Sequence, residues 1–169
     1  MVGVSVRSRY TAACEQFGGR LNRYVHEELT RQWALDTGFS AEDAALIACW
    51  DWNVDVGWPG SPWCNKRYHH LLWGGPRLAR EYFVCAVRER SLPHLGVALH
   101  IRQDVIGHGL MGSLVHWPAM DRWESRSETL RTRIETESKQ MLSAYREGVG
   151  GDDVVIGSLG DQTLSLPPV

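Results

Sequence analysis

Residues 95–109 read LGVALHIRQDVIGHG, and this stretch bears most directly on the fold and the chemistry of the chain. His100, Asp104 and His108 recur at every fourth residue. On an α-helix this spacing turns by only about 40° per step, so the three side chains share one face. Imidazole and carboxylate groups are ligands that suit zinc, iron and manganese. The stretch therefore predicts a helix with a row of metal ligands along one face.

The length of this row favours two metal ions over one. Four residues of helix rise about 6 Å and eight rise about 12 Å, so His100 and His108 are too far apart to clamp one ion. Asp104 lies midway and can share one ion with His100 and another with His108. Two ions about 3.5–4 Å apart form a common hydrolytic centre. The alternative is a polar helix face on which aspartate and histidine pair without any metal.

The composition is that of one folded domain. The chain has 169 residues, of which 43% are hydrophobic and 22% are charged, with a formal net charge of −2. This length supports one domain with its own core, and the composition argues against disorder. The chain has no basic block, which argues against a protein built mainly to bind nucleic acid.

We expect a cytoplasmic protein. The N-terminal sequence has no apolar run of signal-peptide length, and no segment approaches the roughly 20 apolar residues of a membrane span. The cysteines are widely spaced and form no CxxC pair, which argues against a zinc ribbon and favours reduced, mostly buried thiols. They are Cys14, Cys49, Cys64 and Cys85.

Apolar spacing and helix-end signals predict an all-α, single-domain bundle of about five helices around a metal site. Gly38 is expected to end the first helix, and Ser40 with Asp43 resembles a capping box that begins the second. We expect an ordered loop rich in glycine, proline and tryptophan over residues 56–75, and a tail from Gly148 that can hold a short strand. The expected helices cover residues 10–36, 40–54, 76–90, 93–108 and 118–147.

Other candidate ligands lie at the predicted helix ends or in the loop. Acids in an apolar run are costly to bury unless they are paired or bind metal, which draws attention to the end of the second helix. One of the two adjacent loop histidines is expected to face the site. His94 is read as a first-turn residue of its helix and is excluded. The candidates are His26, Asp51, Asp55, His69, His70 and His116, with Asp121 and Glu124 after His116.

The order of these residues resembles the zinc-dependent phospholipase C superfamily, which includes the single-strand-specific zinc nucleases and many bacterial members. The resemblance covers roughly residues 22–145. Its most specific part is Leu95-Gly96-x-x-Leu99-His100-x-x-Gln103-Asp104-x-x-x-His108. The shorter matches are His26, Val54-Asp55, Tyr68-His69 and His116.

This resemblance implies an all-helical fold around a zinc cluster. It implies one zinc ion held by Asp55, His69, His100 and Asp104, and a second held by His26 and Asp104. A third would be held by His108 and His116 with Asp121 or Glu124. The gap between Asp104 and His108 is shorter than is usual in the family, and Met120 stands where an acid is common. The resemblance therefore supports two zinc ions better than three.

The leading functional hypothesis is a metal-dependent hydrolase, with phosphoesters as substrates. A metal ion can lower the pKa of water to about 7, and a second ion can neutralise charge that develops on a phosphoryl oxygen. The general base would be Asp51 or Asp55, whichever is not a ligand. Arg67 or Lys66 would hold an anionic small-molecule substrate. Walls of the substrate site would come from Trp58, Trp63, Trp73 and His70.

Two other classes of protein remain open. The first keeps the metal site but acts on a small metabolite as a lyase, a cyclase or a diiron oxygenase, since similar ligands also hold iron. The metal content of the purified protein distinguishes it from a zinc hydrolase. The second is a non-catalytic helical module that binds no metal. The sequence leaves the substrate, the choice among zinc, iron and manganese, and the oligomeric state undetermined.

Overall fold

The computed structural model describes residues 23–56, 74–109 and 123–148, and every regular element within these ranges is a helix. The predicted all-α class with about five helices is thereby confirmed. The predicted loop and the predicted tail fall almost wholly outside these ranges. The elements are η1 (Tyr24–Leu29), α2 (Thr30–Asp36), α3 (Ala41–Val56), α4 (Gly74–Glu89), α5 (Leu92–His108), η3 (Trp123–Ser125) and α6 (Glu128–Glu147).

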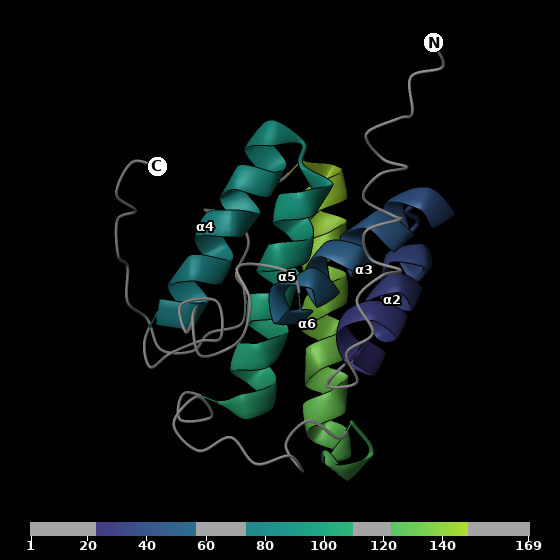
Figure 1. Cartoon of the computed structure of the whole chain (residues 1–169), viewed down its shortest axis with the longest axis vertical. Coiled ribbons are helices and arrows are strands. Elements are labelled where there is room, and N and C mark those ends of the chain that lie inside the picture. Colours follow the sequence, from purple (N-terminus) through teal and green to yellow (C-terminus); the bar gives the residue numbers. More distant parts are fainter. Residues whose placement is uncertain (1–22, 57–73, 110–122, 149–169) are drawn as a thin grey trace.

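Helix α5 is the central element. Figure 1 shows it running alongside α4 and α6, while α3 crosses it obliquely and α2 lies on the far side of α3. Every residue from Leu95 to Ile106 is buried. A helix that is buried around its whole circumference must present a suitable surface to each neighbour.

Three rows of side chains along α5 meet three different surroundings. The largest apolar row faces the main core, which also contains residues of α2, α3, α4 and α6. A second apolar row forms a smaller core with α3 and α4. The third row holds Gly96, His100 and Asp104, and it faces α3 and η1. The two apolar rows are Leu95, Ala98, Leu99 and Ile106, and Val97, Ile101 and Val105.

Three helix ends carry recognisable sequence signals, and the two at Gly38 and Ser40 were predicted. Gly38 follows α2 with a φ of +87°, a conformation that glycine adopts without strain. The Ser40 hydroxyl accepts a hydrogen bond from the backbone N–H of Asp43 at 3.1 Å, as an N-cap does. Ser91 caps α5 in the same way, with Pro93 in the first turn. These ends fix where α3 and α5 begin.

The last helix begins later than predicted. The expectation of a continuous helix from residue 118 is wrong, because α6 begins at Glu128 and a short 3-10 turn, η3, precedes it. Ser127 is extended, and its hydroxyl accepts from the N–H of Leu130 at 3.3 Å. Serine is among the residues most favoured at the N-cap of a helix. Trp123 lies in η3, with its ring 6.2 Å from that of Trp33.

Two further expectations can be compared with the described residues. Cys49 on α3 is disulfide-bonded, so the expectation of reduced thiols is wrong at this position, whereas Cys85 on α4 is a free, buried thiol. None of the helices in the described ranges is long and apolar enough to cross a membrane.

Helices α3 and α5 touch backbone to backbone at Gly96. A Cβ atom at this position would lie 2.6 Å from the carbonyl oxygen of Ile47 and 2.9 Å from the backbone nitrogen of Asp51. Only glycine permits so close an approach. Because Gly96 precedes His100 by one helical turn, this contact brings the acids of α3 against the histidine of α5.

Candidate metal centre

His26 is carried by a π-helical segment. Over Tyr24–Leu29 the chain makes wider turns than an α-helix, and the Thr30 N–H bonds to the carbonyl of Val25, five residues earlier. The Thr30 hydroxyl oxygen also lies 3.1 Å from this carbonyl oxygen. Short π-helical segments are rare and often occur at functional sites. Here His26, with a relative exposure of 2%, faces α3 and α5.

Two histidine rings lie side by side between two carboxylates. The ring centroids of His26 and His100 are 4.3 Å apart. On one side, Asp51 Oδ1 lies 2.8 Å from Nδ1 of His26 and 3.3 Å from Nδ1 of His100. On the other side, Asp104 lies 3.4 Å from Nε2 of His26 and 3.5 Å from Nε2 of His100. Both rings therefore turn Nδ1 toward Asp51 and Nε2 toward Asp104.

The Nε2 side gathers further metal-binding atoms. Asp55 Oδ1 lies 3.7 Å from Nε2 of His100, and His108 Nε2 lies 3.5 Å from Asp104 Oδ1. One ligand atom from each of His26, His100 and Asp104 lies within 4.8 Å of the other two. The predicted face of His100, Asp104 and His108 therefore points inward and meets His26 and Asp55.

The spacing of these atoms fits a metal ion between Asp104 and each histidine. A hydrogen bond between a charged nitrogen and a carboxylate is typically about 2.7–2.9 Å long. The contacts of Asp104 with His26 and His100, at 3.4 and 3.5 Å, are longer. Neighbouring ligands of a tetrahedral zinc ion, each about 2.0–2.1 Å from the metal, are about 3.3 Å apart. The described residues thus supply suitable ligand types at suitable separations.

A network of polar side chains supports the Nδ1 side. The Thr30 hydroxyl donates to Asp51 Oδ2 at 2.7 Å. The Gln103 amide nitrogen donates to Thr30 at 2.9 Å and to Ser138 on α6 at 3.3 Å, while its oxygen lies 2.8 Å from Nδ1 of His26. Sequence reasoning assigned no role to Thr30, Gln103 or Ser138. Thr30 could have been found from its position four residues after His26, because residues at this spacing are neighbours on a helix.

Burial and charge oppose each other in the cluster. Burial favours the neutral form of His26, but the carboxylates of Asp51 and Asp104 outweigh it and hold its pKa well above the usual value. Burial and the neighbouring His26 act against protonation of His100, yet Asp104 and Asp55 raise its pKa to about 9. For Asp104, burial is outweighed by the histidines, which hold its pKa well below its usual range. The carboxylates therefore require positive charge nearby, from protons or from a metal.

Asp51 and Asp55 have different surroundings. The side chain of Asp51 has no exposed surface, and its two oxygens face the histidines and Thr30. That enclosure argues against Asp51 as a general base that meets water. Asp55, at the end of α3, has 20% of its side chain exposed and lies on the Nε2 side.

His108 and Glu124 bear on the third metal that the resemblance implies. Arg126 lies beside the outer nitrogen of His108, with Nη2 3.4 Å from Nδ1. A guanidinium only donates, so this contact favours the proton of His108 on Nε2, directed at Asp104. Glu124 lies in η3 and is exposed. The described residues thus support His108 as a neighbour of Asp104 more than as part of a separate metal site.

The remaining sequence predictions separate into two groups. His94, which was excluded, lies in the first turn of α5, near Glu89 and Tyr82. The other predicted ligands and substrate-binding residues lie outside the described residues, and they remain predictions. They are His69, His70, His116, Asp121, Lys66, Arg67, Trp58, Trp63 and Trp73.

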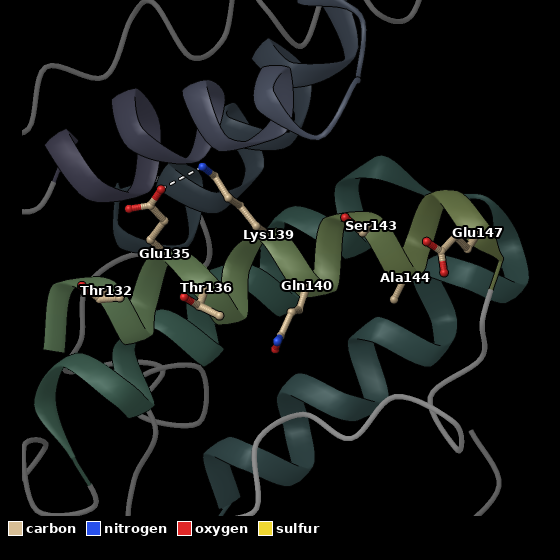
Figure 2. Close-up of a pocket in the computed structure, with 8 residues that line it drawn as sticks. All are labelled: Thr132, Glu135, Thr136, Lys139, Gln140, Ser143, Ala144 and Glu147. Atoms are coloured by element: carbon tan, nitrogen blue, oxygen red, sulfur yellow. Dashed lines mark hydrogen bonds and ion pairs between the residues drawn. The ribbon is translucent and has the colours of Figure 1, made fainter. Parts of the chain in front are cut away.

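A shallow hollow of about 590 Å³ lies on α6. Figure 2 shows that its labelled side chains all come from this one helix, with an ion pair between Glu135 and Lys139. None of its lining residues belongs to the histidine–aspartate cluster. A hollow lined by a single helix has no opposing wall among the described residues, and we assign no ligand to it.

Comparison with known proteins finds no relative of this chain. No protein-family model, no curated protein and no solved structure matches the chain. The resemblance to the zinc-dependent phospholipase C superfamily therefore stays a prediction from the motif, and the function is argued from the site.

Proposed function

We propose that this protein is a metal-dependent hydrolase with a centre of two ions on the Nε2 side of His26 and His100. One observation carries the proposal: both buried rings direct Nε2 at the same carboxylate, Asp104, at 3.4 and 3.5 Å. With Nδ1 protonated, a neutral ring would aim its Nε2 lone pair at a negative oxygen. That arrangement is unfavourable in a buried site unless a cation lies between them.

The ligand set divides around the two oxygens of Asp104. Oδ2, with His100 and Asp55, would hold one ion. Oδ1, with His26, would hold the second. The same division follows from the family resemblance, which adds His69 to the first ion. Zinc suits these nitrogen and oxygen ligands, and iron suits them as well.

The chemistry follows from the charge of the site. Bound ions of this type supply Lewis acidity and activate water at neutral pH. Asp55 and Asp104 would hold such ions on the side of the cluster where Asp55 is partly exposed. Asp51 stays enclosed behind the rings and orients them. Phosphoesters are the substrate class that the family resemblance implies, and they carry the negative charge that such a site attracts.

The competing account has no metal and two protonated histidines. It explains the same contacts as ion pairs, and the raised pKa values of His26 and His100 agree with it. The two accounts differ in metal content. Protein purified without added metal should contain close to two equivalents of zinc by elemental analysis. Iron in place of zinc would favour the oxidative or biosynthetic alternative.

Activity is tested on chromogenic phosphodiesters and phosphomonoesters. We expect the wild-type protein and the control His94→Ala to hydrolyse one of them, because His94 lies outside the cluster. We expect Asp104→Ala to fall to the uncatalysed background, because it removes both shared oxygens. Metal-free wild-type protein that stays inactive after incubation with zinc, iron or manganese would contradict the proposal.

A further inference from the structure

The proposed centre requires both histidines to present a lone pair at Nε2, and a buried carboxylate lies where it can enforce this. Asp51 Oδ1 faces Nδ1 of His26 at 2.8 Å and Nδ1 of His100 at 3.3 Å. An ionised carboxylate only accepts hydrogen bonds, so a ring nitrogen that bonds to it must carry a proton. In a neutral imidazole, a proton on Nδ1 leaves the lone pair on Nε2.

We propose that Asp51 is a positioning residue that holds His26 and His100 together as Nδ1–H tautomers, so that both Nε2 atoms face the ions. This inference rests on the proposed function and deepens it. One carboxylate would set the direction of two ligands that come from different helices. Hydrogen-bonded carboxylates behind metal-binding histidines commonly act in this way.

Thr30 and Gln103 fix the direction of the hydrogen bonds around Asp51 and His26. Thr30 donates its hydroxyl proton to Asp51 Oδ2 at 2.7 Å, so the hydroxyl oxygen is left to accept. The Gln103 amide nitrogen donates to that oxygen at 2.9 Å and to Ser138 at 3.3 Å. The Gln103 oxygen is then directed at Nδ1 of His26, 2.8 Å away, where it accepts as Asp51 does. Every hydrogen bond in the network agrees with a proton on Nδ1 of His26, and the 3.3 Å approach of Asp51 Oδ1 to Nδ1 of His100 favours the same tautomer there.

The decisive substitution is Asp51→Asn, which keeps the shape of the side chain. Its carbonyl oxygen can still accept from Thr30, so its NH₂ group turns toward the two Nδ1 atoms. Those atoms must then accept, and the proton of each neutral ring moves to Nε2. We expect zinc affinity, measured by competition with a chelator, to fall by about 10- to 100-fold.

Glu137→Gln is the matched control. Glu137 is also a buried acid, with a relative exposure of 7%, but it pairs with Arg102 and Arg133. Its substitution removes the same charge from the interior without touching the histidines. We expect the zinc affinity of this variant to stay within about threefold of wild type. An Asp51→Asn protein that binds zinc as tightly as this control would overturn the proposal.

A second readout requires no variant. Nitrogen-15 NMR of the zinc-loaded wild-type protein should show the proton on Nδ1 of both His26 and His100, and a proton on Nε2 of either ring would overturn the proposal. If Asp51→Asn does not fold, this measurement decides. If the wild-type protein binds no metal, the proposed function fails. The tautomers are then measured in metal-free protein at a pH where both rings are neutral. A proton on Nδ1 of both rings would support the role of Asp51, and a proton on Nε2 of either ring would overturn it.

Discussion

Replacing Gly96 with alanine tests the close approach of α3 and α5 that places the histidine rings between their carboxylates. The added Cβ would lie 2.6 Å from the carbonyl oxygen of Ile47, 2.7 Å from Cβ of Trp50 and 2.9 Å from the nitrogen of Asp51. Ordinary contact begins at 3.4 Å, so α3 must retreat by about 0.8 Å, the difference between 3.4 and 2.6 Å. Two of these atoms belong to the backbone, so a side-chain rotation cannot relieve the overlap.

The Gly96→Ala substitution has two opposing effects on the free energy of unfolding. Overpacking costs about 1–3 kcal/mol, while alanine gains up to about 1 kcal/mol over glycine inside a helix. We expect a net loss of about 1–2 kcal/mol in the free energy of unfolding. Metal affinity should suffer more, because ligand positions tolerate only about 0.2 Å. A shift of α3 moves both Asp51 and Asp55 relative to His100, and we expect at least a tenfold loss of zinc affinity.

Gly107→Ala provides the comparison on the same helix. A Cβ at Gly107 would meet only the side chain of Ile134, at 3.8 Å. This variant should be as stable as wild type or up to about 1 kcal/mol more stable. Urea unfolding of the metal-free proteins and zinc titration measure both effects. If Gly96→Ala matches Gly107→Ala in stability and in zinc affinity, the close approach does not position the site.

Three further predictions concern the cluster and its surroundings. Asp104→Ala should lower the metal content by more than one equivalent by elemental analysis, whereas His94→Ala should leave it unchanged. Because the folded pKa of His100 is raised to about 9, its contribution to the stability of the metal-free protein is complete below its unfolded pKa, about 6.5. That contribution is lost as the pH rises to about 9, so urea unfolding should show a less stable metal-free protein at pH 9 than at pH 6.5. Glu137→Ala should cost about 3–5 kcal/mol in the same assay, because it leaves the charge of Arg102 buried.

Periodicity was sufficient to predict the fold class and the inward face of α5. Residues that recur every fourth position stay on one face whatever their neighbours are, so His100, Asp104 and His108 could be placed together before the structure. The first helix was harder, because a π-helical turn at Tyr24–Leu29 follows no simple apolar spacing. The start of α6 was not predicted correctly because both Pro118 and Ser127 are typical helix-start residues, and the sequence alone does not rank them.

The pairing of side chains across helices was harder to predict from the sequence. The sequence named Asp51 and Asp55 together but could not separate their roles, because helical spacing does not say which acid faces the ring of His100. That choice depends on how α3 crosses α5, and Gly96 sets the crossing through backbone contacts. The roles of Gln103 and Ser138 depend on the same tertiary packing, since Ser138 comes from α6.

The central claim is that metal ions lie between Asp104 and the Nε2 atoms of His26 and His100. The most direct measurement is anomalous diffraction at the zinc edge from crystals of protein purified without added metal. The account predicts two peaks, one on each side of the Asp104 carboxylate, both on the Nε2 side of the rings and none beside Asp51. A map without peaks there, in crystals grown at neutral pH with zinc present, would contradict it.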